Sequence, residues 1–149
     1  MRAAERFTHA SDRICEIIDW FEAMTPSTLN EIETVYGSQA HFRDPFNDVS
    51  DAQAIRAIYA HMFENLQSPR FVITSVIEQD RAVFLAWQFK FAWRAREFDI
   101  PGATQFCLDE TGLIIEHQDY WDVAQGLYEK LPVLGAVLKR LRRAMATKV

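Results

Sequence analysis

The sequence has few cysteines, no basic excess and no long apolar run. Its two cysteines, Cys15 and Cys107, lie far apart without the spacing of a zinc site, so we expect free thiols in a reducing compartment. The formal net charge is −5, which argues against a nucleic-acid partner because binding phosphates takes a concentrated basic face. No apolar stretch approaches the roughly 20 residues that span a bilayer, and the charged N-terminal segment does not resemble a signal peptide. We therefore expect a cytoplasmic protein with no membrane span.

Internal repeats, linkers rich in Gly, Ser or Pro, and cofactor motifs are also missing. The chain has no P-loop, no dinucleotide fingerprint and no cluster of residues with metal-ligand spacing, so we expect neither a metal nor an organic cofactor. Its 149 residues suffice for one domain with a full core, and 49% hydrophobic with 25% charged residues is typical of a globular protein. We expect a single domain over residues 1–149.

The first half of the sequence predicts helices. Apolar residues recur at helical spacing within residues 11–24, and a second helix is expected to end at Gly37. Residues 38–43 predict a short strand. A third helix with an apolar stripe follows, capped by Ser50 or Asp51.

The second half changes to a period of two. Residues 70–80 and 81–94 are rich in β-branched and aromatic residues and predict a hairpin. Residues 98–122 predict two more strands joined at the turn "DETG", with a bulge or kink at Pro101–Gly102. Residues 123–149 predict a helical C-terminal extension. Helices followed by antiparallel strands indicate an α+β fold, with the helices on one face of a curved sheet.

One predicted strand has an unusually bulky face. Alternate residues there are large and apolar: Val83, Leu85, Trp87, Phe89, Phe91 and Trp93. Such a face either fills an ordinary core or forms the wall of a cavity that the helices leave open, and the pattern leaves both alternatives open.

Three polar side chains accompany this apolar face. One face of the last strand carries Leu113, Ile115, His117, Asp119 and Trp121. An inward carboxylate must be paired, hydrated or protonated, and His117 is the simplest partner for Asp119. Asp44 has the parity of Phe42 and is followed by Pro45, so its carboxylate either points inward or forms a turn on the solvent side.

The motifs "FRDP", "AIRAIYA" and "GLIIEHQDYWD", together with the order of elements, resemble the nuclear transport factor 2-like superfamily. The similarity covers roughly residues 8–125 and is to the SnoaL-like and ketosteroid isomerase-like branch. It implies a cone-shaped, curved antiparallel sheet wrapped around three N-terminal helices, with a pocket at the wide end. It also implies a homodimer formed through the outer face of the sheet.

The resemblance implies roles for single residues. The ketosteroid isomerase pattern makes Asp44 the general base and Tyr59 a hydrogen-bond donor. Trp20 and Thr104 occupy the positions of that enzyme's two oxyanion donors, which argues against steroid isomerisation because stabilising the enolate oxygen is a large part of that catalysis. The SnoaL-like cyclases use an acidic residue on a late strand, which corresponds to Asp119.

We therefore predict a pocket for a small hydrophobic molecule and cofactor-independent proton transfer, as an isomerase, cyclase or lyase. The candidate catalytic residues are Asp44, Asp119, His117 and Tyr59. The candidate substrate-binding residues are Trp20, Phe42, Met62, Trp87, Phe89, Phe91, Thr104, Phe106 and Trp121. The alternative is a non-catalytic domain that binds a small ligand or serves as a dimeric scaffold.

Overall fold

A computed structural model of the protein describes residues 1–123. The helices are α1 (Ala3–Arg6), α2 (Asp12–Glu22), the 3₁₀ helix η1 (Thr28–Thr34) and α3 (Ala52–Asn65). The strands are β1 (Tyr36–Arg43), β2 (Asp48–Ser50), β3 (Gln67–Gln79), β4 (Ala82–Trp93), β5 (Arg96–Leu108) and β6 (Ile114–Trp121). The extension predicted for residues 123–149 falls almost entirely outside the described residues. Within them, no helix is long and apolar enough to cross a membrane.

Each of the two longer helices begins after a capping side chain, and the sequence predicted the cap of the second one. Ser11 caps α2 by accepting a hydrogen bond from the amide of Ile14, and Asp51 caps α3 through the amide of Ala54 at 2.7 Å. The second predicted helix differs, because it is a 3₁₀ helix that ends at Thr34 instead of Gly37. Residues 36 and 37 belong to β1, where Tyr36 pairs with β6 and is fully buried. Sheet pairing overrides the local helical pattern there.

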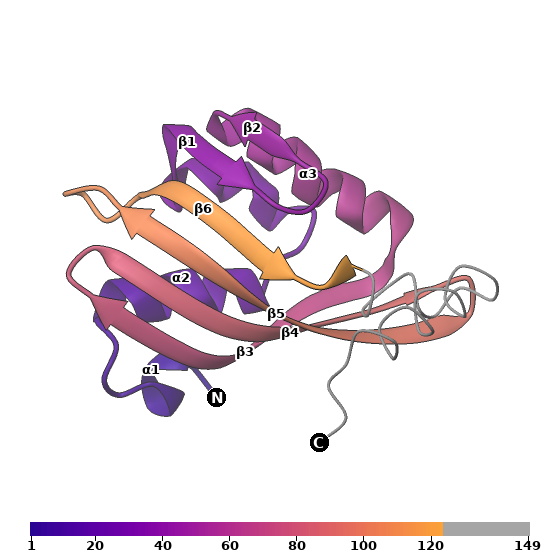
Figure 1. Ribbon diagram of the computed structural model, residues 1–149, viewed down its shortest axis with the longest axis horizontal. Helices are drawn as coiled ribbons and strands as arrows, with labels where there is room; N and C mark the ends of the chain where they lie inside the picture. The colour runs from indigo at the N-terminus through magenta and orange to yellow at the C-terminus, as the bar shows by residue number, and fades with distance from the viewer. Residues whose placement is uncertain (124–149) are drawn as a thin grey trace, which may run out of the picture.

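The six strands form one curved, open sheet in the order β2-β1-β6-β5-β4-β3 (Figure 1). Strands β3 to β6 form an antiparallel meander, and α3 connects β2 at one edge to β3 at the other. Strand β6 then returns beside β1 and runs parallel to it, while every other pairing is antiparallel. The predicted α+β fold class is confirmed, with this one parallel pairing added.

Irregular pairing lies at other positions than the sequence suggested. The register of β3 with β4 shifts twice, and bulges of this kind increase the curvature of a sheet. The bulge predicted at Pro101–Gly102 is wrong, because β5 pairs with β4 continuously through both residues. Pro101 lies just beyond the end of the pairing between β5 and β6, which stops at Gly102, and strand edges of this kind tolerate proline. A Cβ built on Gly102 would lie 2.1 Å from the Trp87 ring, so Gly102 provides space for the indole.

A register shift between β5 and β6 also changes one predicted face. Ile115 was expected to lie on the same face as His117, but it is 38% exposed, whereas Ile114 and His117 are buried. The extra residue turns the first part of the strand over, which is the usual effect of a bulge on alternation. The prediction for Ile115 is therefore wrong, and that for His117 is confirmed.

The core lies between the concave face of the sheet and the helices. Helix α2 packs against β3, and α3 packs against η1, β1, β2 and β3 (Figure 1). On β4 the predicted alternation holds, with Val83, Leu85 and Trp87 buried. The outer face of the sheet has exposed apolar side chains, among them Ile77, Phe84, Ile115 and Tyr120.

Candidate functional site

A cavity of about 340 Å³ lies between α3, the turn at residues 44–47 and the far ends of β3, β4 and β6. Half of its lining residues are Phe, Tyr or Trp. They include Phe42, Phe71, Trp87, Phe89, Phe91 and Trp121. The bulky face of β4 therefore serves in both ways that the sequence left open: Trp87 and Phe91 are buried with the core and also border the cavity.

A carboxylate held by two side-chain donors lies at the edge of this cavity. The Oδ1 atom of Asp119 accepts a hydrogen bond from the Thr104 hydroxyl at 2.5 Å and lies 2.8 Å from Nε2 of His117. Thr104 in turn accepts a hydrogen bond from the indole N–H of Trp87 at 2.8 Å. Thr104 and His117 are buried, and the side chain of Asp119 is 15% exposed. The contact between Asp119 and His117 that the sequence predicted is present.

The hydrogen-bond chain continues behind His117. Nδ1 of His117 lies 2.8 Å from the hydroxyl of Tyr36, which lies 3.0 Å from the hydroxyl of Tyr59. All three side chains are buried. Strands β1 and β6 and helix α3 thus each contribute one member, so the chain forms only when these elements have packed together.

The proton positions follow from the donors. Trp87 can only donate, so Thr104 accepts from it and directs its own hydroxyl proton at Asp119. In the tautomer with the proton on Nε2, His117 donates to Asp119 and accepts at Nδ1 from Tyr36. Every donor then points along the chain toward Oδ1 of Asp119. Within residues 1–123, Oδ2 of the same carboxylate makes no hydrogen bond.

Burial keeps the two tyrosines protonated. It raises the pKa of Tyr36 and the pKa of Tyr59 well above the ordinary value of 10.0, and for Tyr59 the negative charge of Asp119 acts in the same direction. Both phenols therefore remain donors at neutral pH.

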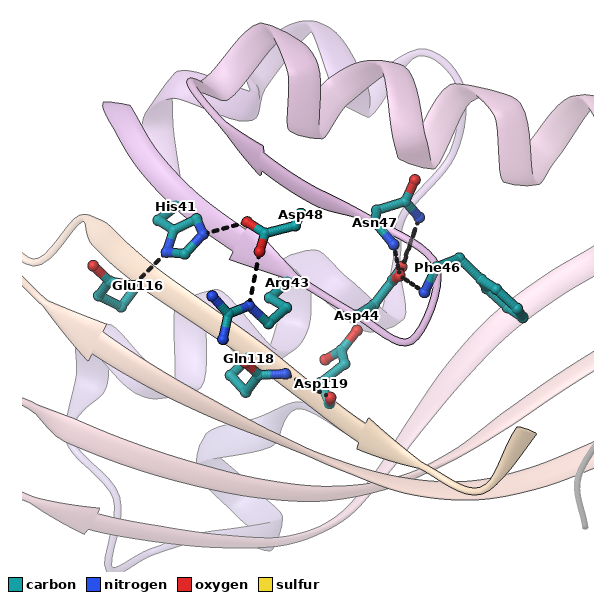
Figure 2. Close-up of polar contacts among 9 residues, drawn as sticks. All are labelled: His41, Arg43, Asp44, Phe46, Asn47, Asp48, Glu116, Gln118 and Asp119. Atoms are coloured by element: carbon teal, nitrogen blue, oxygen red, sulfur yellow. Dashed lines mark hydrogen bonds and ion pairs between the residues drawn. The ribbon is translucent and has the colours of Figure 1, made fainter. Parts of the chain in front are cut away.

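Asp44 lies at the mouth of the cavity, but its oxygens face the turn (Figure 2). Oδ1 accepts from the amides of Phe46 and Asn47 at 2.7 and 2.6 Å, and both oxygens accept from the side-chain amide of Asn47. A carboxylate that accepts successive amides organises a tight turn. The 44–47 turn also places Phe46 against Trp121, with ring centroids 5.6 Å apart.

The structure places the other sequence-predicted residues in three groups. Met62 borders the main cavity together with the aromatic residues. Thr104 and Phe106 line a smaller void of about 20 Å³, which has room for roughly one water molecule. Trp20 borders neither space; its ring packs edge-on against Tyr59, and its indole N–H has no partner within residues 1–123.

Sequence reasoning missed Tyr36. The "VYG" segment was assigned to the end of a helix, which hid its strand parity. Tyr36 has the same parity as Ala40 and Phe42, and all three are buried. A strand begun two residues earlier would have placed it on the inner face.

His41 lies on the face of β1 opposite to that of Phe42. It forms ion pairs with Asp48 at 2.6 Å and Glu116 at 3.2 Å on the outside of the sheet (Figure 2). Within residues 1–123, no group of three or more His, Cys, Asp or Glu side chains is placed to hold a metal ion.

Residues 17–117 match the family model of the SnoaL-like domain. The chain belongs to the SnoaL-like family. No functionally curated protein matches this SnoaL-like chain by sequence.

Solved structures similar to the SnoaL-like chain agree in fold. One is a hypothetical protein with a ketosteroid isomerase-like fold from Catenulispora acidiphila, in complex with trimethylamine; it is 15% identical, has a TM-score of 0.68, and the match covers 79% of this chain and 91% of that one. A putative SnoaL-like polyketide cyclase from Jannaschia is 15% identical, with a TM-score of 0.65 and coverage of 76% and 85%. An epoxide hydrolase of the LEH-like type from M. tuberculosis is 14% identical, with a TM-score of 0.67 and coverage of 87% and 96%. At these identities the likeness shows the fold alone.

Proposed function

We propose that this SnoaL-like protein binds a small, largely apolar molecule in its aromatic cavity and acts on it by proton transfer, with Asp119 as the base. The observation that carries the proposal is the difference in hydrogen bonding between the two carboxylate oxygens of Asp119. Oδ1 accepts two side-chain hydrogen bonds, while Oδ2 makes none within the described residues, in a carboxylate that borders the cavity. A proton acceptor that is held in place on one side and open on the other suits general base catalysis.

The remaining members of the hydrogen-bond chain position that base. His117 fixes the orientation of Asp119 and stabilises its ionised form, while Tyr36 and Tyr59 hold the imidazole in the tautomer that donates from Nε2. Because Asp44 already accepts several amide hydrogen bonds, we assign it to the structure of the cavity mouth.

The reaction class that fits is isomerisation, cyclisation or elimination on a small molecule. The trimethylamine held by the Catenulispora neighbour supports a small ligand in this fold. A second candidate is binding without chemistry. It is favoured by the hydroxyl of Thr104, whose proton is directed at Asp119 and is therefore not available to a substrate oxygen.

The test of the base compares two aspartates. A library of small apolar compounds is screened by thermal shift, and each bound compound is recovered and identified by mass spectrometry. With a converted compound, Asp119→Asn is expected to lower turnover by about 10²–10⁴-fold, the usual contribution of a general base. Asp44→Asn, which keeps an acceptor oxygen for the turn, is the matched control and is expected to stay within about tenfold of the wild type.

Each result has a defined meaning. Turnover that survives Asp119→Asn in a folded variant contradicts the assignment of the base. A compound that stabilises the protein but is always recovered unchanged supports binding without chemistry.

We also infer that two copies associate through the outer face of the sheet. Phe84 is 42% exposed and pairs across strands with Ile77, which is 64% exposed, so their side chains form an apolar contact surface. Phe84→Glu is expected to halve the mass measured by sedimentation equilibrium. A wild-type protein that sediments as a monomer at micromolar concentration contradicts the dimer.

A further inference from the structure

The charged side chains that border the cavity are acidic. Among the lining residues of the described part of the chain, Asp44 and Asp119 are the carboxylates, His61 is the one imidazole, and neither Lys nor Arg is present. The side chain of Asp119 is mostly buried, and its hydrogen-bond partners are the hydroxyl of Thr104 and the imidazole of His117. Within residues 1–123, no Lys or Arg side chain pairs with this carboxylate, and His117 is the one ionisable group that it contacts. A mostly buried carboxylate without a Lys or Arg partner is costly, so a ligand of opposite charge is favoured there.

The walls of the cavity favour the same kind of ligand. Half of the lining residues are Phe, Tyr or Trp, and three of them are the tryptophans Trp87, Trp93 and Trp121. The face of an aromatic ring carries negative electrostatic potential, and a desolvated cation near such a face gains about 2 kcal/mol or more. Carboxylates set among several aromatic rings are thus complementary to a cationic nitrogen on an apolar body.

The donors at the inner end of the cavity point away from any ligand. The indole N–H of Trp87 donates a hydrogen bond to Thr104, and Thr104 and His117 each donate a hydrogen bond to Asp119. An oxyanion formed on a substrate would therefore find none of these three protons. This end of the cavity accepts hydrogen bonds, and it does not stabilise a developing negative charge.

We infer that the ligand of this cavity is a small apolar molecule that carries a cationic nitrogen, as a protonated or quaternary amine or an iminium. The inference rests on the proposed function, because it concerns the same cavity and the same Asp119.

Such a substrate also removes the need for an oxyanion hole. When Oδ2 of Asp119 takes a proton from the carbon next to an iminium, the C–H electron pair becomes a carbon–carbon π bond. The π pair of the C=N⁺ unit moves onto nitrogen, which becomes neutral. The carboxylate becomes a neutral acid at the same time. In an iminium that carries a C=C bond between its β and γ carbons, loss of the α proton gives a dienamine. Return of the proton to the γ carbon moves the C=C bond to the α,β position and regenerates the cation and the carboxylate, so the isomerisation needs no other reactant.

The experiment compares two probes of the same shape on the full chain. Benzyltrimethylammonium is the cation, and neopentylbenzene is its neutral isostere, with carbon in place of nitrogen. Binding is followed by tryptophan fluorescence, because Trp87, Trp93 and Trp121 border the cavity. Asp119→Asn removes the inner charge. Asp80→Asn makes the same chemical change in an exposed turn outside the cavity and serves as the matched control.

We expect the cation to bind the wild type at least tenfold more tightly than its isostere, although the isostere is the more hydrophobic of the two. Asp119→Asn is expected to reduce this ratio to about threefold or less, and Asp80→Asn to leave it unchanged. Equal or tighter binding of neopentylbenzene overturns the cationic ligand and leaves the apolar cavity of the proposed function standing. Binding of neither probe overturns both. A preference for the cation that persists in Asp119→Asn shows that the preference does not come from Asp119, and this also overturns the inference. If Asp119→Asn does not fold, the ratio of the two affinities for the wild type decides the question.

Discussion

Replacing Tyr36 by phenylalanine tests the buried hydrogen-bond chain most directly. Tyr36 is 0% exposed, and its hydroxyl contacts both His117 and Tyr59. Tyr36→Phe keeps the ring but leaves Nδ1 of His117 without its donor and the hydroxyl of Tyr59 without its partner. Leaving one buried polar group unpaired costs about 1–3 kcal/mol, so two such groups give roughly 2–6 kcal/mol of lost unfolding free energy. That loss is a large part of the stability of an ordinary domain.

The measurement is urea unfolding followed by circular dichroism, with equal slopes for the two proteins as a condition for comparing midpoints. Tyr120→Phe is the matched control, because Tyr120 is 51% exposed and its hydroxyl makes only a 3.5 Å contact. The control is expected to change the unfolding free energy by less than about 0.5 kcal/mol. If Tyr36→Phe costs no more than the control, the hydroxyl of Tyr36 does not support the network and does not position His117 beside Asp119.

A double-mutant cycle with Tyr59→Phe separates this contact from general effects of burial. Once Tyr36→Phe has been made, removing the Tyr59 hydroxyl also removes a group that the first change left unpaired. The combined loss is therefore expected to fall short of the sum of the two single losses by about 0.5–3 kcal/mol. Additive losses would show that the two phenols, 3.0 Å apart in the structure, do not interact.

Two further predictions concern packing and charge. Gly102→Ala is expected to destabilise the protein by about 1–3 kcal/mol in urea unfolding, because the new methyl group overlaps the Trp87 ring. Gly37→Ala, whose Cβ meets only ordinary contacts, is the control, and a similar loss in both would contradict the steric argument. The hydrogen bond to Asp48 raises the pKa of His41 above 6.5, so the stabilisation by its charge is complete below pH 6.5 and is lost as the pH rises through the folded-state pKa. The stability difference between the wild type and His41→Gln is therefore expected to be larger at pH 5.5 than at pH 8.5, and a difference that grows with pH would refute this assignment.

The order of secondary structure was accessible from the sequence because it depends on neighbours in the chain. The helix within residues 11–24, the cap of α3 at Asp51 and the alternation along β4 each involve residues a few positions apart, and all three predictions are confirmed. The same local rules failed where pairing with a distant strand decided the conformation. The segment before Gly37 was assigned to a helix, but pairing with β6 draws Tyr36 into β1.

Bulges limited the prediction of faces in a similar way. The sequence marked Pro101–Gly102 as the irregular position, because these residue types are unusual inside strands. In the structure β5 passes regularly through both residues, and the register instead shifts near Leu108, where it turns Ile115 outward. A residue type indicates that regular pairing is difficult, whereas the register is set by the whole set of contacts between two strands.

By itself, the sequence determined an α+β chain with a bulky apolar face on β4 and with His117 and Asp119 two residues apart on one strand. Only the tertiary structure decided that the hydroxyl of Tyr36 forms a hydrogen bond with His117, 81 positions away, and that the carboxylate of Asp44 turns toward its own loop. The physical reason is that periodicity depends on the geometry of a single strand or helix. The partner of a polar side chain depends on how separate elements are brought together, which no local pattern encodes.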